Sequence, residues 1–381
     1  MQTSSERILT THVGSMPRPQ DVVDMLFAED SGELTDRGAY DETMRRAVAE
    51  IVSRQRAAGV DVVSDGEMSK ISYATYVRHR LTGFEVGEVP RATPRDLDEF
   101  PEYRDRLAQA GGTPKYLRPI CRGPIQVRDT VPLQKDLDRF RQALAASDPL
   151  EGFMNAASPG VIAVFQPNEY YESQDAYLEA LAVAMKEEYE AIVGAGFILQ
   201  VDCPDLAMGR HIKYRDVDDE EFLRHAEKQV EALNFALSDV PAESVRMHLC
   251  WGNYEGPHHC DIPLETLIGV ILKAKPQAIL FEAANPRHAH EWQVWQEAEI
   301  PEDKILVPGV LDTTTNFVEH PLLVAERIER FAHIVGRERV MAGTDCGFGT
   351  FAGFGAVHPS ICFAKLEALA EGAAIASERL W

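Results

Sequence analysis

The chain has 381 residues, 45% of them hydrophobic, and a formal net charge of -23 at pH 7. The hydrophobic fraction is sufficient for one large core, whereas the acidic balance argues against partners such as nucleic acid or an anionic membrane surface, which require clustered Lys and Arg. We find no run of about eighteen apolar residues and no basic-then-apolar N-terminus, so we expect a cytoplasmic protein.

Short apolar runs typical of buried strands alternate with helical patterns along most of the chain. A stretch rich in proline and charge, residues 73–115, interrupts this alternation, and we interpret it as an excursion such as a helical lid. The expected strands are residues 8–15, 60–64, 117–127, 161–165, 198–202, 247–250, 278–282, 305–311 and 340–343. The expected helices include residues 41–58, 176–195, 219–237, 321–334 and 361–377.

Alternating strands and helices imply a parallel sheet with right-handed crossovers. We predict an α/β fold, a (β/α)8 TIM barrel, that spans residues 1–381 as a single domain and carries the insertion after its second strand. A closed barrel needs only eight of the nine candidate strands, so either 117–127 or 161–165 is expected to be extra. An open doubly wound sheet is the alternative, although no Gly-x-Gly-x-x-Gly motif follows the first strand.

Four residues with metal-binding side chains end three of the expected strands: His248, Cys250, Glu282 and Cys346. His248 and Cys250 are two residues apart, so both side chains leave the same face of a strand. The C-terminal ends of barrel strands meet at one face, where we expect these ligands to converge on Zn²⁺. Zinc held by two thiolates is suited to activating a substrate thiol. Taken singly, each residue could instead be a packed core residue.

A second cluster, His258-His259-Cys260, follows in a loop that contains Gly256 and Pro257. Side chains on consecutive residues diverge unless the backbone turns sharply. We therefore predict that this loop lines the site, with metal binding by the cluster itself as the alternative. The six cysteines are scattered along the chain, which predicts free thiols or ligands rather than a disulfide framework.

Seven short motifs follow or end the expected strands along the chain: Thr10-Thr11-His12-Val13-Gly14-Ser15-Met16-Pro17-Arg18-Pro19, Asp65-Gly66-Glu67, Gln200-Val201-Asp202-Cys203-Pro204, His248-Leu249-Cys250, Phe281-Glu282, Gly309-Val310-Leu311-Asp312 and Asp345-Cys346-Gly347. With these motifs the chain resembles the catalytic C-terminal barrel of the cobalamin-independent methionine synthases, zinc enzymes that methylate the thiol of homocysteine. The resemblance implies that the four residues above are the zinc ligands and that Ser15, Glu67 and Asp202 hold the amino-acid substrate. Two carboxylates facing an ammonium group favour both ionised forms; the alternative is that Glu67 and Asp202 are helix N-caps or solvated loop acids.

The chain departs from this family on the side of the folate donor. We expect no extra N-terminal barrel. The family places a Trp against the pterin, and the two segments that could correspond to that position, residues 123–129 and 158–165, contain no Trp. The position of a proton-donating His is Thr314. The resemblance therefore extends to short, single-barrel methionine synthases and to the epoxyalkane:coenzyme M transferases, which open an epoxide with a zinc-bound thiolate.

We predict a zinc-dependent thiol S-alkyltransferase with a role in methionine biosynthesis. The thiol is homocysteine or coenzyme M, and the donor is methylfolate, methylcobalamin or an epoxide. The substrate thiol would displace water or Glu282, bind zinc as a thiolate and attack the donor carbon. His12, Tyr170, His258 or His259 could protonate the leaving group. The alternatives are a non-catalytic zinc- or thiol-binding protein and the related porphyrin decarboxylases, which use Arg and Asp without a metal.

Overall fold

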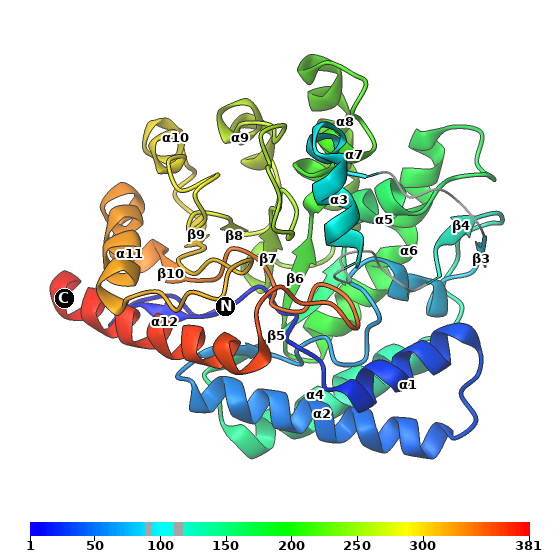
Figure 1. Ribbon diagram of the computed structural model, residues 1–381, viewed down its shortest axis with the longest axis horizontal. Helices are drawn as coiled ribbons and strands as arrows, with labels where there is room; N and C mark the ends of the chain where they lie inside the picture. Colours follow the sequence, from blue (N-terminus) through cyan, green and yellow to red (C-terminus); the bar gives the residue numbers. More distant parts are fainter. Residues whose placement is uncertain (88–92, 110–116) are drawn as a thin grey trace.

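Parallel strands form a closed barrel in the computed structural model, which describes residues 1–87, 93–109 and 117–381 (Figure 1). Six strands form one sheet in the order β2-β5-β6-β7-β8-β9, and β1 pairs in parallel with β10. Backbone hydrogen bonds close both remaining seams, from Gly343 to Pro308 (3.0 Å) and from Asp61 to Thr10 (3.2 Å). The strands are β1 (Leu9–Thr10), β2 (Val62–Ser64), β5 (Glu151–Ala157), β6 (Ile198–Asp202), β7 (Val245–His248), β8 (Ala278–Phe281), β9 (Ile305–Pro308) and β10 (Met341–Ala342).

The third barrel strand corrects the sequence analysis, because both candidates for it lie outside the barrel. Residues 161–165 belong to the helix α5 (Pro159–Phe165), whose N-cap Ser158 and following proline are typical of a helix start. Residues 117–127 contain β4 (Pro119–Cys121), which pairs antiparallel with β3 (Phe84–Val86). The barrel strand is β5, a segment without a single β-branched residue. Its position between β2 and β6 outweighs its weak strand propensity.

Helices surround the strands, and the five predicted helices are confirmed. The longer ones are α1 (Gln20–Ser31), α2 (Arg37–Ala57), α4 (Val131–Ser147), α6 (Gln174–Gly194), α8 (Asp219–Ala236), α9 (Leu264–Ile271), α11 (Pro321–Val335) and α12 (Pro359–Leu380); the short ones are α3 (Pro101–Leu107), α7 (Gly209–Ile212) and α10 (Trp292–Glu297). The C-terminal α12 contacts both α11 and β1, so the two ends of the chain meet at one side of the barrel (Figure 1). Among the described residues, no helix combines the length and apolar character that a bilayer crossing requires.

The excursion follows β2, as predicted. Part of the expected segment, residues 88–92 and 110–115, lies outside the described residues. The described part contains the 3-10 helices η1 (Thr75–His79) and η2 (Arg95–Glu99), and η2 contacts α7. Asp96 of η2 accepts hydrogen bonds from the Tyr254 hydroxyl (2.6 Å) and the His258 backbone N–H (2.8 Å). The excursion is thereby attached to the loop that follows β7.

A buried polar layer lies inside the barrel, where a purely apolar core would be the simpler solution. The Arg246 guanidinium donates to Gln200 Oε1 (2.8 Å), Thr11 Oγ1 (2.9 Å) and the His12 carbonyl (2.8 Å). Burial lowers the pKa of Arg246 to about 9. Each of the three guanidinium nitrogens thus has a partner, either Gln200 on β6 or the adjacent Thr11 and His12 that follow β1, which makes the buried charge tolerable. Gln200 also contacts the carboxylate that ends β6, so this layer positions part of the site described next.

Candidate metal and substrate site

Three side chains with soft or borderline metal-binding atoms meet at the C-terminal ends of the barrel strands. His248 ends β7, Cys250 follows it, and Cys346 follows β10. Their ligand atoms lie within 4.8 Å of one another, and the two Sγ atoms are 3.7 Å apart. The prediction that strand ends bring these residues together is confirmed for this trio.

The chemistry of the trio fits a metal ion. Neither ring nitrogen of His248 has a hydrogen-bond partner among the described residues, although the side chain is buried. Buried polar atoms without partners are rare, and each one calls for an explanation. The hydrogen bond from Cys250 lowers the pKa of the Cys346 thiol to about 6, while the pKa of Cys250 is raised. One thiolate, a second thiol that metal binding would deprotonate, and an imidazole suit zinc or a similar divalent ion.

Glu282 lies beside the trio but is held by other partners. Its Oε1 accepts from the Trp251 backbone N–H (2.9 Å), and its Oε2 accepts from Asn285 Nδ2 (2.8 Å) and the Arg287 guanidinium (2.6 Å). Asp345 fixes the loop after β8 by accepting three backbone N–H groups from residues 283–285. Glu282 is therefore not part of the close ligand group, and its role as fourth ligand stays a prediction.

The three residues expected to bind substrate line the same pocket as the metal-binding trio. This pocket contains about 420 Å³ of empty space, and Ser15, Glu67 and Asp202 belong to its wall. Glu67 follows β2 in a tight turn, in which it adopts a left-handed φ of 56° and its N–H bonds to Asp65 Oδ1 (2.9 Å). The ends of different strands thus supply a carboxylate and the two cysteines to one pocket wall.

Both carboxylates in this pocket are almost completely buried. Glu67 is 2% exposed and Asp202 is 5% exposed, and neither is the N-cap of a described helix, so the interpretation as caps or solvated loop acids is wrong. Burial raises the pKa of Glu67 to about 8 and also raises the pKa of Asp202. Asp202 accepts from Asn155 Nδ2 (3.0 Å) and Gln200 Nε2 (2.9 Å). Glu67 Oε2 has no hydrogen-bond partner in the described part of the chain, and the nearest Arg18 nitrogen is 3.9 Å away.

The predicted proton donors lie outside the wall of this pocket. His12 is buried, its Nε2 bonds to Gln55 (2.7 Å), its Nδ1 accepts from the Gly14 N–H (3.1 Å), and burial lowers its pKa to about 4. His258 bonds to Asp261 and to the Tyr254 carbonyl, whereas His259 points to Glu99. Tyr170 is half-exposed and also absent from the wall.

Asn253 belongs to the pocket wall and was missed from the sequence. Its amide donates to the Gly347 carbonyl (2.7 Å) and Thr350 Oγ1 (2.8 Å), and its carbonyl oxygen accepts from Thr313 (3.0 Å). It therefore connects the loops that follow β7, β9 and β10 around the cysteine ligands. Its partners are 60 to 97 residues away along the chain, so no local pattern indicates this role.

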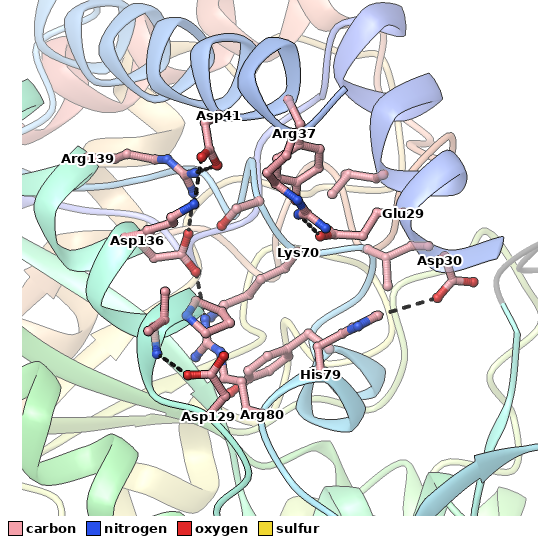
Figure 2. Close-up of a pocket in the computed structure, with 18 residues that line it drawn as sticks. Glu29, Asp30, Arg37, Asp41, Lys70, His79, Arg80, Asp129, Asp136 and Arg139 are labelled. Atoms are coloured by element: carbon pink, nitrogen blue, oxygen red, sulfur yellow. Dashed lines mark hydrogen bonds and ion pairs between the residues drawn. The ribbon is translucent and has the colours of Figure 1, made fainter. Parts of the chain in front are cut away.

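A larger pocket, which is open to solvent, lies between α1, α2, α4 and η1, and neither cysteine of the trio lines it (Figure 2). Most of its cationic side chains are paired with carboxylates, such as Arg80 with Asp136 (2.7 Å) and Glu188 (2.6 Å) and Arg139 with Asp41 (2.7 Å). Lys70 instead donates to the Asn155 carbonyl. This charge balance favours a structural ion-pair network over an anion-binding site. The metal-binding trio and buried polar atoms without partners in the described part of the chain line the smaller pocket, which is therefore our candidate active site.

Comparison with known proteins identifies the family to which the chain is similar. The family model for the catalytic domain of cobalamin-independent synthases matches residues 8–90 and 115–359. The methionine synthase of Saccharolobus solfataricus is 27% identical over 97% of this chain and 95% of its own length, and that of Sulfurisphaera tokodaii is 24% identical over 97% and 93%.

Two solved structures are similar in fold. The B12-independent methionine synthase of Shewanella sp. W3-18-1, in complex with selenomethionine, has a TM-score of 0.75 at 18% identity, with 98% of this chain and 99% of that chain covered. A putative vitamin-B12 independent methionine synthase of Listeria monocytogenes has a TM-score of 0.64 at 20% identity, with the same coverage. With the family model matched over most of its length, the chain belongs to the cobalamin-independent methionine synthase family.

Proposed function

We propose that this chain is a zinc-dependent thiol S-alkyltransferase, and specifically a homocysteine S-methyltransferase of the methionine synthase type. The observation that carries the proposal is one pocket wall that contains both the His248, Cys250 and Cys346 trio and two buried carboxylates. We also propose that residues 1–381 act as one domain, since β1 and β10, from opposite ends of the chain, pair in the same barrel.

The trio would hold the zinc ion, with Glu282 as an exchangeable fourth ligand. Zinc, when bound, lowers the pKa of a coordinated thiol and so supplies a nucleophile at neutral pH. The chain's own contribution is to hold the ligands in place. Asp345 and Asn285 orient the loop that carries Glu282, and Asn253 bridges the loops around the cysteines.

The carboxylates favour homocysteine over coenzyme M. An ammonium group between Glu67 and Asp202 would offset the burial that raises both of their pKa values, because an opposite charge nearby favours the ionised carboxylate. Arg18 and Lys70 lower the pKa of Glu67 only in part. The sulfonate of coenzyme M would instead bring a third negative group to the same wall. The two carboxylates therefore favour the amino-acid thiol and give no support to the epoxide reaction.

The side chains around Thr314 bear on the identity of the alkyl donor. Thr314, which replaces the family's proton-donating His, donates its hydroxyl to Asp312 (2.8 Å). Asp312 also accepts from Thr315 (2.6 Å), so both threonine hydroxyls donate to the same carboxylate. A methyl donor that needs no proton on its leaving group is consistent with this arrangement, and methylcobalamin is such a donor.

The test is thiol binding to the cobalt-substituted protein. We expect homocysteine to change the visible spectrum saturably. Two other thiols, coenzyme M and the deaminated analogue of homocysteine, should each bind at least about tenfold more weakly, which is the loss expected for one hydrogen bond to a charged group. A metal centre that responds to no thiol would refute the transferase. An equal response to all three thiols would refute the role of the carboxylates while leaving the metal site intact.

A further inference from the structure

A second group of potential metal ligands lies outside the pocket wall. Glu99 ends η2 of the excursion, and His259 and Cys260 belong to the loop after β7. Their ligand atoms all lie within 4.8 Å of one another, and His259 Nε2 is 3.1 Å from Glu99 Oε1. Carboxylate, imidazole and thiol are three of the side-chain types that bind zinc in proteins.

The backbone at His258 explains why this group forms with Glu99 rather than with two consecutive histidines. His258 has a left-handed φ of 53°, which few residues other than glycine adopt. Its ring is buried, with Nδ1 bonded to Asp261 (2.9 Å) and Nε2 to the Tyr254 carbonyl (3.1 Å). The next ring, that of His259, is directed outward to Glu99. The turn therefore directs the His258 ring away from the cluster, and the His259 ring contacts the Glu99 carboxylate instead.

The two segments that supply the ligands are already fastened together without an ion. Asp96, one 3-10 turn before Glu99, accepts from the Tyr254 hydroxyl (2.6 Å) and the His258 N–H (2.8 Å). The Phe100 ring contacts the His259 ring edge-on, with centroids 5.8 Å apart. Ligands that are held in place before binding lose little conformational freedom when an ion arrives, which raises affinity.

From this geometry we propose a second divalent transition-metal site, formed by Glu99, His259 and Cys260, that clamps the excursion to the loop after β7. Zn²⁺ is the metal that we name for the test. Binding replaces the thiol proton of Cys260, which is released to water. His259 is 42% exposed and Glu99 is 66% exposed, which leaves room for water as the fourth ligand and predicts weaker binding than in the buried trio.

The clamp lies next to the pocket in the chain. The loop after β7 carries Asn253, which lines the pocket, six residues before His259. Fastening the end of this loop to η2 would restrict its movement. The proposal goes beyond the thiol transferase and does not depend on it, because it requires only that the three surface ligands bind an ion.

The experiment counts zinc ions. The metal-free full-length protein is titrated with Zn²⁺ by calorimetry, and bound metal is counted by native mass spectrometry for the wild type and for His259→Ala/Cys260→Ser. His290→Ala is the matched control, since His290 is an exposed histidine outside both ligand groups. Circular dichroism confirms that each variant is folded. We expect two zinc ions per chain in the wild type and the control, and one in the double variant.

The outcomes separate this proposal from the proposed function. The surface site would be refuted if the double variant still bound two ions. It would also be refuted if the wild type bound only one ion and Cys346→Ala lost that ion. One ion that is lost only in the double variant would support the surface site and count against metal binding by the buried trio.

Discussion

Replacing Glu67 by glutamine should make the metal-free protein more stable while weakening its binding to homocysteine. Glu67 is 2% exposed, and burial raises its pKa from 4.5 to about 8. The folded protein therefore binds this proton more tightly than the unfolded chain does. Ionisation of Glu67 thus destabilises the fold, and the penalty grows as the pH rises from 4.5 to 8.

The magnitude follows from the same pKa difference. At about 1.4 kcal/mol per pKa unit, the shift from 4.5 to about 8 sets an upper bound of about 5 kcal/mol on the destabilisation, which is almost complete at pH 8, and relaxation of the buried site reduces the expected effect to roughly 1 to 3 kcal/mol. Glutamine has the same shape without the charge, so Glu67→Gln removes the penalty. It also removes one carboxylate from the proposed ammonium site, and a hydrogen bond to a charged group contributes about 1.5 to 3 kcal/mol. We expect homocysteine binding to weaken about 10- to 100-fold.

The first assay compares thermal and denaturant unfolding of the wild type and Glu67→Gln at about pH 5, 6, 7 and 8, which spans the expected titration of this carboxyl group. The second measures homocysteine binding by calorimetric titration. Glu367→Gln is the matched control, because Glu367 is exposed on α12. We expect the advantage of Glu67→Gln to increase with pH and that of the control to stay near zero. A variant less stable than the wild type at pH 8, or an advantage independent of pH, would refute the reasoning.

Three further substitutions test the site and its support. Cys346→Ala should lose the buried metal ion while the circular dichroism spectrum stays native, and full metal content would contradict the ligand assignment. Gly309→Ala would place a methyl group 2.6 Å from the Asp345 backbone. We expect this substitution to lower the free energy of unfolding by about 1 to 3 kcal/mol and to weaken metal binding. Gly194→Ala is the control and should be tolerated, because no atom lies within 4 Å of the added methyl group. Arg80→Ala removes the cation from two buried ion pairs and should cost about 3 to 5 kcal/mol by denaturant unfolding; a loss below about 1 kcal/mol would show that the network is dispensable.

The strand ends were predictable where hydrophobic runs were strong. The run 278–281 is buried throughout, and its apolar pattern alone identifies β8. In contrast, β5 contains Gly152 and Asn155 and has no strand-like pattern. These two residues are explained by tertiary contacts: a Cβ on Gly152 would come within 2.7 Å of Leu144, and Asn155 donates to Asp202. A local pattern cannot reveal a residue whose selection depends on partners far along the chain.

The sequence by itself determined which chemical groups end the strands. His248 and Cys250 are two residues apart on a strand, so local geometry already directs them to one side. Only the tertiary structure decided which groups meet. It places the Cys346 and Cys250 Sγ atoms 3.7 Å apart and pairs Glu282 with Arg287. The left-handed backbone at His258 also directs the rings of His258 and His259 to different partners. The physical reason is that periodicity follows from the backbone of one segment, whereas distances across a barrel depend on the packing and hydrogen bonds of all its segments together.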